Sequence, residues 1–154
     1  MKIIFLDYDG VLNNTYFLLR QKERGAENDF DPKKIEILKQ VCDNTNAMVV
    51  VTSSWRFNER ARMFLLEKGI PIYDVLKPDT GTRGEDIDLW LQETPMEIEK
   101  YVIFDDDTSH YSPQQMKHTI CTKECFSNDL CAEYDCCMGL QDKHIKWAKA
   151  MLED

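Results

Sequence analysis

Two groups of carboxylates in this sequence follow apolar runs and could act together. Asp7 and Asp9 lie two residues apart after the first run, and Asp105, Asp106 and Asp107 follow a later one. Several carboxylates at one place repel each other unless a cation neutralises them or one takes a proton. Magnesium is the natural cation, because it prefers oxygen ligands. An Asp-x-Asp-Gly pair alone is also typical of a calcium loop, and a triple Asp of a solvated loop, so the metal-site hypothesis depends on the combination.

Residues near these acids could bind a phosphate group. Gly10 allows a tight turn in which backbone N–H groups face the phosphate. Thr52 ends a second apolar run, and we expect a helix capped by Ser53 or Ser54 to start directly after it. A hydroxyl at such a helix N-terminus favours an anion, because unpaired N–H groups and the helix dipole both attract negative charge. We assign Thr52 to the phosphate; the serines could act on substrate or only as N-caps.

A positive side chain should offset the charge of the phosphate. Lys77 and Arg83 are the candidates, since they flank the start of a predicted helix, although either could simply be a solvent-exposed charge. Other basic residues form two clusters that could contact nucleic acid, with aromatic side chains available for stacking on bases. These clusters are Arg20, Lys22 and Arg24 with Tyr16 and Phe17, and Arg56, Arg60 and Arg62. A solvated flap and an ordinary charged helix face are the alternative interpretation.

Apolar runs alternate with amphipathic segments along the chain. The strands are expected at residues 2–7, 47–52, 70–76, 101–104 and 117–122, and the helices at about 31–44, 53–68, 85–93 and 139–151. This alternation predicts a single domain, residues 1–154, with a three-layer α/β/α architecture and a mostly parallel five-stranded sheet. Ligands bind beyond the carboxyl ends of the strands in such sheets, which is where the polar residues above should meet.

At these residues the sequence resembles the haloacid dehalogenase (HAD) superfamily of phosphatases, which use an aspartate nucleophile. DYDGVLN (7–13), VVVT (49–52) and FDDD (104–107) are similar to its first, second and fourth motifs. A closer resemblance is to the HAD domains of Swiss Army Knife RNA repair proteins, through DGVLN (9–13), TSSWR (52–56), RGEDIDLWL (83–91) and YVIFDDD (101–107). In that group an Arg-Gly pair takes the third-motif position, which favours Arg83, although Lys77-Pro78 is also a common third-motif form.

The resemblance implies a Rossmann-like HAD fold and a mechanism. Asp7 would attack phosphorus and form an aspartyl-phosphate, and Asp9 would serve as general acid and then general base. Thr52 and Arg83 would bind the phosphoryl group. Mg²⁺ would be held by Asp7, the backbone carbonyl of Asp9, Asp106 as a direct ligand and Asp105 as a second one.

The spacing of the motifs leaves room for a flap at about 13–30 but not for a separate cap domain, so we expect a capless enzyme with an open site. An open site suits a phosphate on something large, and the resemblance implies RNA or DNA ends or nucleotides. A phosphatase of a small metabolite or phosphoprotein, and a non-catalytic receiver-like module that binds Mg²⁺ and a phosphoryl group, are the alternatives. Asp9 argues against the receiver-like module, which needs only one phosphoryl acceptor.

The composition indicates a soluble globular domain. The 154 residues are 43% hydrophobic and 31% charged, and the formal net charge is −9, so any contact with nucleic acid requires a local basic patch. The first apolar run is too short for a secretory signal, and no run approaches the ~20 residues of a membrane span. We therefore expect a cytoplasmic protein without membrane contact; the oligomeric state is left open.

Six cysteines raise the question of a metal or redox role. Five of them fall within residues 121–137, namely Cys121, Cys125, Cys131, Cys136 and Cys137. His118 precedes this segment and His144 follows it. This segment could hold a structural zinc ion, but it lacks the paired C-x₂-C spacing typical of such sites. Free thiols are the favoured interpretation, because no secretory signal is evident.

Overall fold

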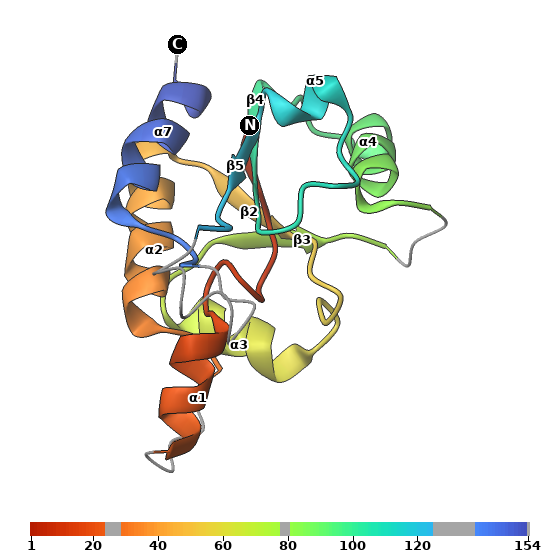
Figure 1. The fold of residues 1–154 in the computed structure, drawn as a ribbon. Coiled ribbons are helices and arrows are strands. Elements are labelled where there is room, and N and C mark those ends of the chain that lie inside the picture. The colour runs from red at the N-terminus through yellow and green to blue at the C-terminus, as the bar shows by residue number, and fades with distance from the viewer. Residues whose placement is uncertain (24–28, 78–80, 125–137, 154) are drawn as a thin grey trace.

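A five-stranded sheet forms the centre of the protein. The computed structural model describes residues 1–23, 29–77, 81–124 and 138–153. The strands are β1 (Lys2–Leu6), β2 (Met48–Val51), β3 (Ile72–Val75), β4 (Lys100–Asp105) and β5 (Thr119–Cys121). Their order across the sheet is β3-β2-β1-β4-β5, and each neighbouring pair is parallel (Figure 1). The predicted parallel sheet is therefore confirmed.

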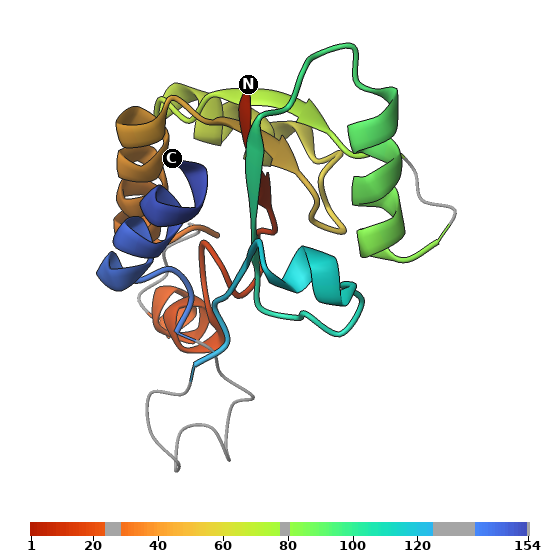
Figure 2. The same ribbon diagram turned by 90° about the horizontal axis from the view of Figure 1, so that it is seen from above.

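Helices cover both faces of this sheet. They are α1 (Thr15–Glu23), α2 (Pro32–Thr45), α3 (Glu59–Glu67), α4 (Arg83–Glu93), α5 (Pro113–Met116) and α7 (Asp142–Leu152). Figure 2 shows α2 and α7 side by side on one face and α4 on the other. This is the predicted three-layer α/β/α arrangement.

Burial on both faces explains the continuous apolar run of β1. Ile4 and Leu6 belong to the core cluster beneath α2, α3 and α7. Ile3 and Phe5 belong to the cluster beneath α4, where the ring of Phe5 packs edge-on against Trp90 with the centroids 5.5 Å apart. Because successive side chains of a strand point to opposite faces, a central strand between two helical layers must be apolar at every position.

Side-chain caps determine where two of the helices begin. The Asp31 carboxylate accepts a hydrogen bond from the backbone N–H of Lys33, and Pro32 takes the first helical position of α2. Thr82 caps α4 in a reciprocal capping box with Glu85. A helix starting near residue 31 was predicted, and the cap at Thr82 fixes the position of Arg83 at the start of α4.

The chain after β2 differs from the prediction. The helix predicted from Ser53 or Ser54 begins only at Glu59, and Asn58 is its N-cap, accepting a hydrogen bond from the backbone N–H of Ala61. The Ser53 hydroxyl instead accepts a hydrogen bond from the backbone N–H of Trp55 over 3.3 Å. Serine stabilises such turns in competition with a helix, and the predicted helix N-terminus beside Thr52 is therefore wrong.

Three smaller differences concern the periphery. The predicted flap contains a helix, α1, whose N-terminal residues are held by the Asn14 side chain, which accepts a hydrogen bond from the backbone N–H of Phe17. The short helix α5 was not predicted. The last helix begins at Asp142 and not at Gly139, because Gly139 adopts a positive φ of 72°, which is outside the right-handed helical region.

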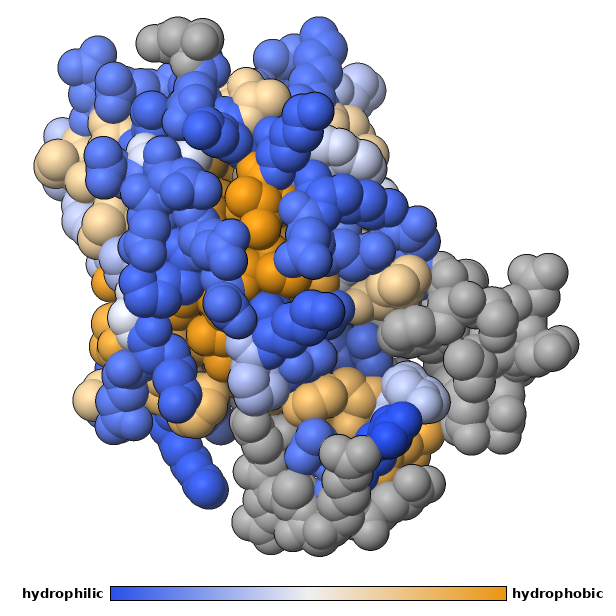
Figure 3. All heavy atoms as spheres, turned by 90° about the vertical axis from the view of Figure 1, so that its left-hand side faces the viewer, coloured by the Kyte–Doolittle hydropathy of each residue, from blue (hydrophilic) through white to orange (hydrophobic). Residues whose placement is uncertain are grey.

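The outer surface of the α2 and α7 side is mostly hydrophilic, with an apolar strip near the centre of the view and smaller apolar patches toward its left and lower edges (Figure 3). In the described part of the chain, no helix combines the length and the apolar character that crossing a bilayer requires.

Candidate active site

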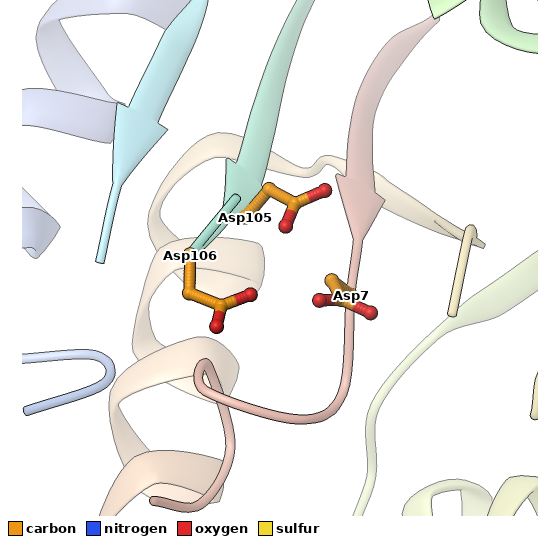
Figure 4. Close-up of side chains that lie close together, drawn as sticks. All are labelled: Asp7, Asp105 and Asp106. Carbon is orange, nitrogen blue, oxygen red and sulfur yellow. The ribbon is translucent and has the colours of Figure 1, made fainter. Parts of the chain in front are cut away.

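Three carboxylates converge at the carboxyl edge of the two central strands. Asp7 follows β1, Asp105 ends β4 and Asp106 comes directly after it, and one oxygen of each lies within 4.8 Å of the others. Figure 4 shows these side chains pointing toward one another. Strand pairing causes the convergence, since the backbone N–H of Asp7 donates to the Phe104 carbonyl of β4 over 3.1 Å. The structure thus brings together acids from the two groups that the sequence singled out.

Asp105 is the most enclosed of the three. Its carboxylate is fully buried, and Oδ2 accepts hydrogen bonds from Arg83 Nη1 at 2.7 Å and from the Tyr111 hydroxyl at 2.6 Å. Oδ1 accepts a third bond, at 3.0 Å, from the backbone N–H of Asp107. A buried charge needs such compensation to be tolerated.

Arg83 links Asp105 to Asp7. Its Nη1 lies 3.6 Å from Asp7 Oδ1 as well as 2.7 Å from Asp105 Oδ2. Burial lowers the pKa of the guanidinium, but Asp7 and Asp105 raise it by more, so Arg83 stays charged. Lys77, the other candidate, points elsewhere: its side chain is 79% exposed and pairs with Glu93 at 3.3 Å. Of the two third-motif candidates, only Arg83 is paired with the acids.

The protonation of the other two acids shows that this cluster lacks positive charge. Burial raises the pKa of Asp7 to about 8, with Asp105 adding to the rise and Arg83 opposing it. Burial, followed by Asp105, also raises the pKa of Asp106. Three carboxylates face one guanidinium, and the oxygen donors are of the type that Mg²⁺ prefers. The residues present therefore fit a magnesium ion.

The loop after Asp7 is shaped by Gly10. Gly10 has a φ of 78°, and a Cβ atom there would fall on the carboxylate of Asp106. The Asn13 side chain accepts from the Gly10 N–H at 3.0 Å and donates to Asp9 Oδ1 at 3.1 Å, while the Thr122 hydroxyl donates to the Gly10 carbonyl. Glycine is needed here for both its backbone angle and its lack of a side chain. The exposed Asp9 carboxylate is held at this loop without joining the three clustered acids.

Thr52 presents an unused polar group beside the acids. Its backbone N–H donates to the Leu6 carbonyl at 2.8 Å, which fixes it next to the end of β1. Its side chain is 1% exposed, and its hydroxyl has no hydrogen-bond partner in the described protein. A buried hydroxyl of this kind is costly unless something binds it. Ser53, also predicted to contact substrate, is buried in the adjoining turn.

Arg56 has a different environment from the one expected. Its guanidinium donates to the backbone carbonyls of Ser53, Leu76 and Lys77, at 2.9 to 3.2 Å. It therefore ties the turn after β2 to the end of β3, and it also borders the pocket described next. Its effect on the turn could not have been read from the sequence, because its partners are backbone atoms distant along the chain.

A pocket of about 430 Å³ opens beside the acids. Its wall includes Thr52, Arg83 and Tyr111, so it adjoins the cluster on the side of α4. Tyr111 was missed in the sequence, although it lies six residues after Asp105. The only available signal was its proximity to a motif, since an aromatic residue in a loop carries no periodic pattern.

The two predicted basic clusters make mainly local contacts. Arg20 donates to the Tyr16 hydroxyl at 2.9 Å, and Arg62 lies 3.8 Å from Glu59. Arg60 is exposed on α3, and Phe17 is half-buried in α1. Arg24 and the side chain of Lys22 lie outside the described residues.

Most of the residues of the zinc hypothesis lie outside the described part of the chain, namely Cys125, Cys131, Cys136 and Cys137. Cys121 is a free, exposed thiol. His118 stacks on Tyr101, and the Nδ1 atom of His144 accepts a hydrogen bond from the backbone N–H of Gln141. Within the described residues, the candidate metal group is the three aspartates.

Comparison with known proteins assigns the chain to a family. No curated protein and no solved structure gives a significant match. Residues 3–126, which are well over half of the chain and include both groups of candidate carboxylates, match the family described as the HAD domain in Swiss Army Knife RNA repair proteins. The chain therefore belongs to this family of HAD domains.

Proposed function

We propose that this protein is a Mg²⁺-dependent phosphatase that hydrolyses phosphomonoesters through an aspartyl-phosphate at Asp7, on nucleic-acid ends or nucleotides. The observation that carries the proposal is the cluster of Asp7, Asp105 and Asp106, with Arg83 inside it and the unpartnered Thr52 hydroxyl beside it. Membership of a HAD family supports a hydrolase of this kind.

The chemistry follows from the position of each group. An oxygen of Asp7 attacks phosphorus and displaces the alcohol, which takes a proton from Asp9. Asp9 then removes a proton from the water that cleaves the acyl-phosphate bond and regenerates Asp7. The exposure of Asp9 suits this task, because its carboxyl group must reach both the departing alcohol and solvent water.

Arg83 and Thr52 serve the phosphoryl group during the transfer. Arg83 has further N–H groups besides the Nη1 that binds the acids, and the Thr52 hydroxyl is free to donate. Preorganised donors of this kind stabilise charge as it moves from one oxygen to another. Lys77, being paired with Glu93, has no part in this proposal.

The metal would be held by Asp7, Asp106 and the backbone carbonyl of Asp9. Mg²⁺ supplies positive charge that offsets the acids and the phosphoryl oxygens. Asp105 would not bind the metal directly, because its oxygens already accept hydrogen bonds from three donors. It would instead orient Arg83.

Nucleic-acid ends or nucleotides are proposed as substrates from the family's association with RNA repair. The insertion after β1 supports an open site, since its described part is the single helix α1. A receiver-like module is the second candidate, because it also gathers acids around a metal; it would accept a phosphoryl group but not release it.

The test measures phosphate release from p-nitrophenyl phosphate and from oligonucleotides with 3′- or 5′-phosphates, with Mg²⁺ or with EDTA. We expect Asp7→Asn to lower kcat by at least about 10³-fold and Asp9→Asn by at least about 10²-fold. Asp43→Asn is the matched control, because Asp43 is exposed near the end of α2, at the opposite edge of the sheet. A wild-type protein that is inert on every substrate, or an active Asp7→Asn variant, would contradict the proposal.

A further inference from the structure

The pocket beside the acids has a second arginine in its wall. Thr52 and Arg83, which we assign to the phosphoryl group, form one part of this wall, and Arg56 forms another. A phosphate held by Thr52 and Arg83 would therefore share the pocket with the guanidinium of Arg56. The next group of the substrate along the chain is thus the one that meets Arg56.

Backbone carbonyls hold the Arg56 guanidinium in a fixed position. Its Nε donates to the Leu76 carbonyl at 2.9 Å, and its Nη atoms donate to the carbonyls of Ser53 and Lys77 at 3.1 and 3.2 Å. The guanidinium carbon lies 4.9 Å from the centroid of the Phe57 ring. A guanidinium carries five N–H groups, so one on each Nη atom is left without a partner among the described residues. A donor fixed in this way loses little conformational entropy when it binds a ligand.

The positive charge of Arg56 is not offset by an ion pair. Its three hydrogen-bond partners are neutral carbonyls, and no carboxylate of the described residues lies within ion-pair distance of it. Arg83, in contrast, is paired with Asp105 at 2.7 Å and with Asp7 at 3.6 Å. Of these two arginines, Arg56 is therefore the one whose charge is available to a second anion.

Two acids also line the pocket, and they indicate where a second anion would lie. Asp86 belongs to the first turn of α4. Asp107 follows β4 and is exposed, and its Oδ1 accepts hydrogen bonds from the backbone N–H and the hydroxyl of Ser109. Arg56 is anchored instead just after β3, and β2 and β1 separate that strand from β4. Since carboxylates repel phosphate, the second anion belongs on the β3 side of the pocket, against Arg56.

The size and the rim of the pocket suit the last nucleotide of a strand. A volume of about 430 Å³ lies within the range of small-molecule pockets. Ser54 and Thr82 contribute hydroxyl groups to the lining and His110 an imidazole, which can form hydrogen bonds with a sugar or a base. Ser54, Gly81 and His110 are exposed, so the pocket opens to solvent and a longer strand can leave it.

We infer, on the basis of the proposed function, that Arg56 binds the phosphodiester next to the terminal phosphate, so that the substrate is the end of a nucleic-acid strand. The terminal phosphate lies against Asp7, with Thr52 and Arg83 as its donors. The sugar that carries it lies in the pocket, and the next phosphate accepts hydrogen bonds from the free N–H groups of Arg56. Arginine suits this task, because its planar fork and its charge both match a phosphate. A mononucleotide has no second phosphate and leaves Arg56 unused.

The test varies the charge of the second phosphate while keeping its place in the chain. Dinucleotides with a terminal 5′- or 3′-phosphate are made with either a phosphodiester linkage or a methylphosphonate linkage, which is neutral and similar in shape. At the better-hydrolysed end, we expect kcat/KM of the wild type to be higher for the phosphodiester by at least about tenfold, as for the loss of a hydrogen bond to a charged group. The matching mononucleotide should resemble the methylphosphonate. This comparison uses the wild type alone and does not depend on how a variant folds.

Arg56→Gln tests whether this preference comes from Arg56. The variant should reduce the preference to below about threefold, because an amide keeps donors but has no charge. The ratio is taken within one protein, so a general loss of activity from a disturbed turn cancels. Arg60→Gln, at an exposed position on α3 outside the pocket lining, removes the same charge and should keep the preference. Equal use of the two linkages by the wild type, or an undiminished preference in Arg56→Gln, would overturn the inference.

Further measurements separate the alternatives. A nucleoside 3′,5′-bisphosphate carries a second phosphate without a strand; if it is hydrolysed better than the dinucleotide, the substrate is a free nucleotide and the strand-end assignment is wrong. Calorimetric titration of Asp7→Asn with the two dinucleotides should show the same preference without turnover, and equal affinities would contradict it. Hydrolysis of p-nitrophenyl phosphate that depends on Asp7, together with equal use of the two linkages, would refute the role of Arg56 and leave the phosphatase proposal standing.

Discussion

Asp105 and Asp106 are adjacent at the end of β4, yet their carboxylates lie in different surroundings. Asp105 is fully buried and accepts hydrogen bonds from Arg83, Tyr111 and the backbone of Asp107. Asp106 is half-buried, lies against the loop at Gly10 and has no positively charged partner among the described residues. Asp105 therefore stabilises the structure of the site, whereas the negative charge of Asp106 is available to bind a ligand.

Asp7 resembles Asp106 more than Asp105 in this respect. Its link to Arg83, at 3.6 Å, is longer than that of Asp105, and its raised pKa shows that its negative charge is not fully compensated. Active sites often retain such uncompensated groups at a cost in stability. Four substitutions test this difference. Three replace a carboxylate and ask whether it stabilises the fold or binds a ligand, and the fourth removes a hydrogen-bond donor to Asp105.

Asp105→Asn should have the largest effect. An amide cannot accept hydrogen bonds at both of its ends, so one of the donors around Asp105 would lose its partner, and Arg83 would lose its closest counter-charge. Breaking a buried ion pair costs about 3–5 kcal/mol. Urea unfolding should show a loss of this size, whereas Asp107→Asn, at an exposed position, should change the free energy of unfolding by less than about 0.5 kcal/mol. Similar losses in both variants would remove the distinction.

Asp7→Asn should act in the opposite direction when metal is absent. The folded protein keeps the proton on Asp7 up to about pH 8, whereas an unfolded chain loses it near 3.8. Between these values the folded state binds more protons, so this group lowers the free energy of unfolding as pH rises. In EDTA at pH 8, the Asn variant should be more stable than the wild type by several kcal/mol, at most about 5 kcal/mol.

The control for this prediction is the addition of Mg²⁺, which should raise the unfolding temperature of the wild type and have much less effect on Asp7→Asn. A wild type that is the more stable of the two in EDTA at pH 8 would show that Arg83 already compensates Asp7 fully.

Asp106→Asn should leave the fold intact and weaken metal binding. Because Asp106 has no positively charged partner in the described structure, replacing it removes a ligand oxygen and a negative charge without breaking an ion pair. We expect the affinity for Mg²⁺, measured by calorimetry, to fall by at least about tenfold. Asp107→Asn removes the same charge from the next residue and should change this affinity by less than about threefold. Equal losses would mean that the acids attract the ion only through their summed field.

Much of the framework could be predicted because local patterns determine it. An uninterrupted apolar run such as the one before Asp7 is typical of a strand buried on both faces, and an Asp-Pro pair such as Asp31-Pro32 is typical of a helix start. Since the carboxyl ends of parallel strands lie at one edge, the meeting of Asp7 with Asp105 and Asp106 followed from the order of the motifs.

The features that escaped prediction depend on contacts between distant parts of the chain. The turn after Thr52 is stabilised by Arg56, whose partners include carbonyls at the end of β3, so no local pattern could distinguish it from a helix N-terminus. The choice between Lys77 and Arg83 was likewise open, because it depends on which side chain reaches Asp105 after folding. The role of Tyr111 was also not predictable, because its hydroxyl meets Asp105 only in the folded chain.

Tyr111→Phe should have the smallest of the four effects. The change removes the hydroxyl that donates to Asp105 Oδ2 and keeps the ring that packs in the core beneath α4. Asp105 would retain Arg83 and the backbone of Asp107, so we expect a loss of about 1 kcal/mol in the free energy of unfolding. With one donor gone, Asp105 would hold Arg83 less firmly, and kcat should fall severalfold with little change in KM. Tyr73→Phe, at an exposed position on β3, is the matched control and should alter neither quantity. If Tyr111→Phe also altered neither, the hydroxyl would be incidental, and Asp105 would need only Arg83 and the backbone to hold its place.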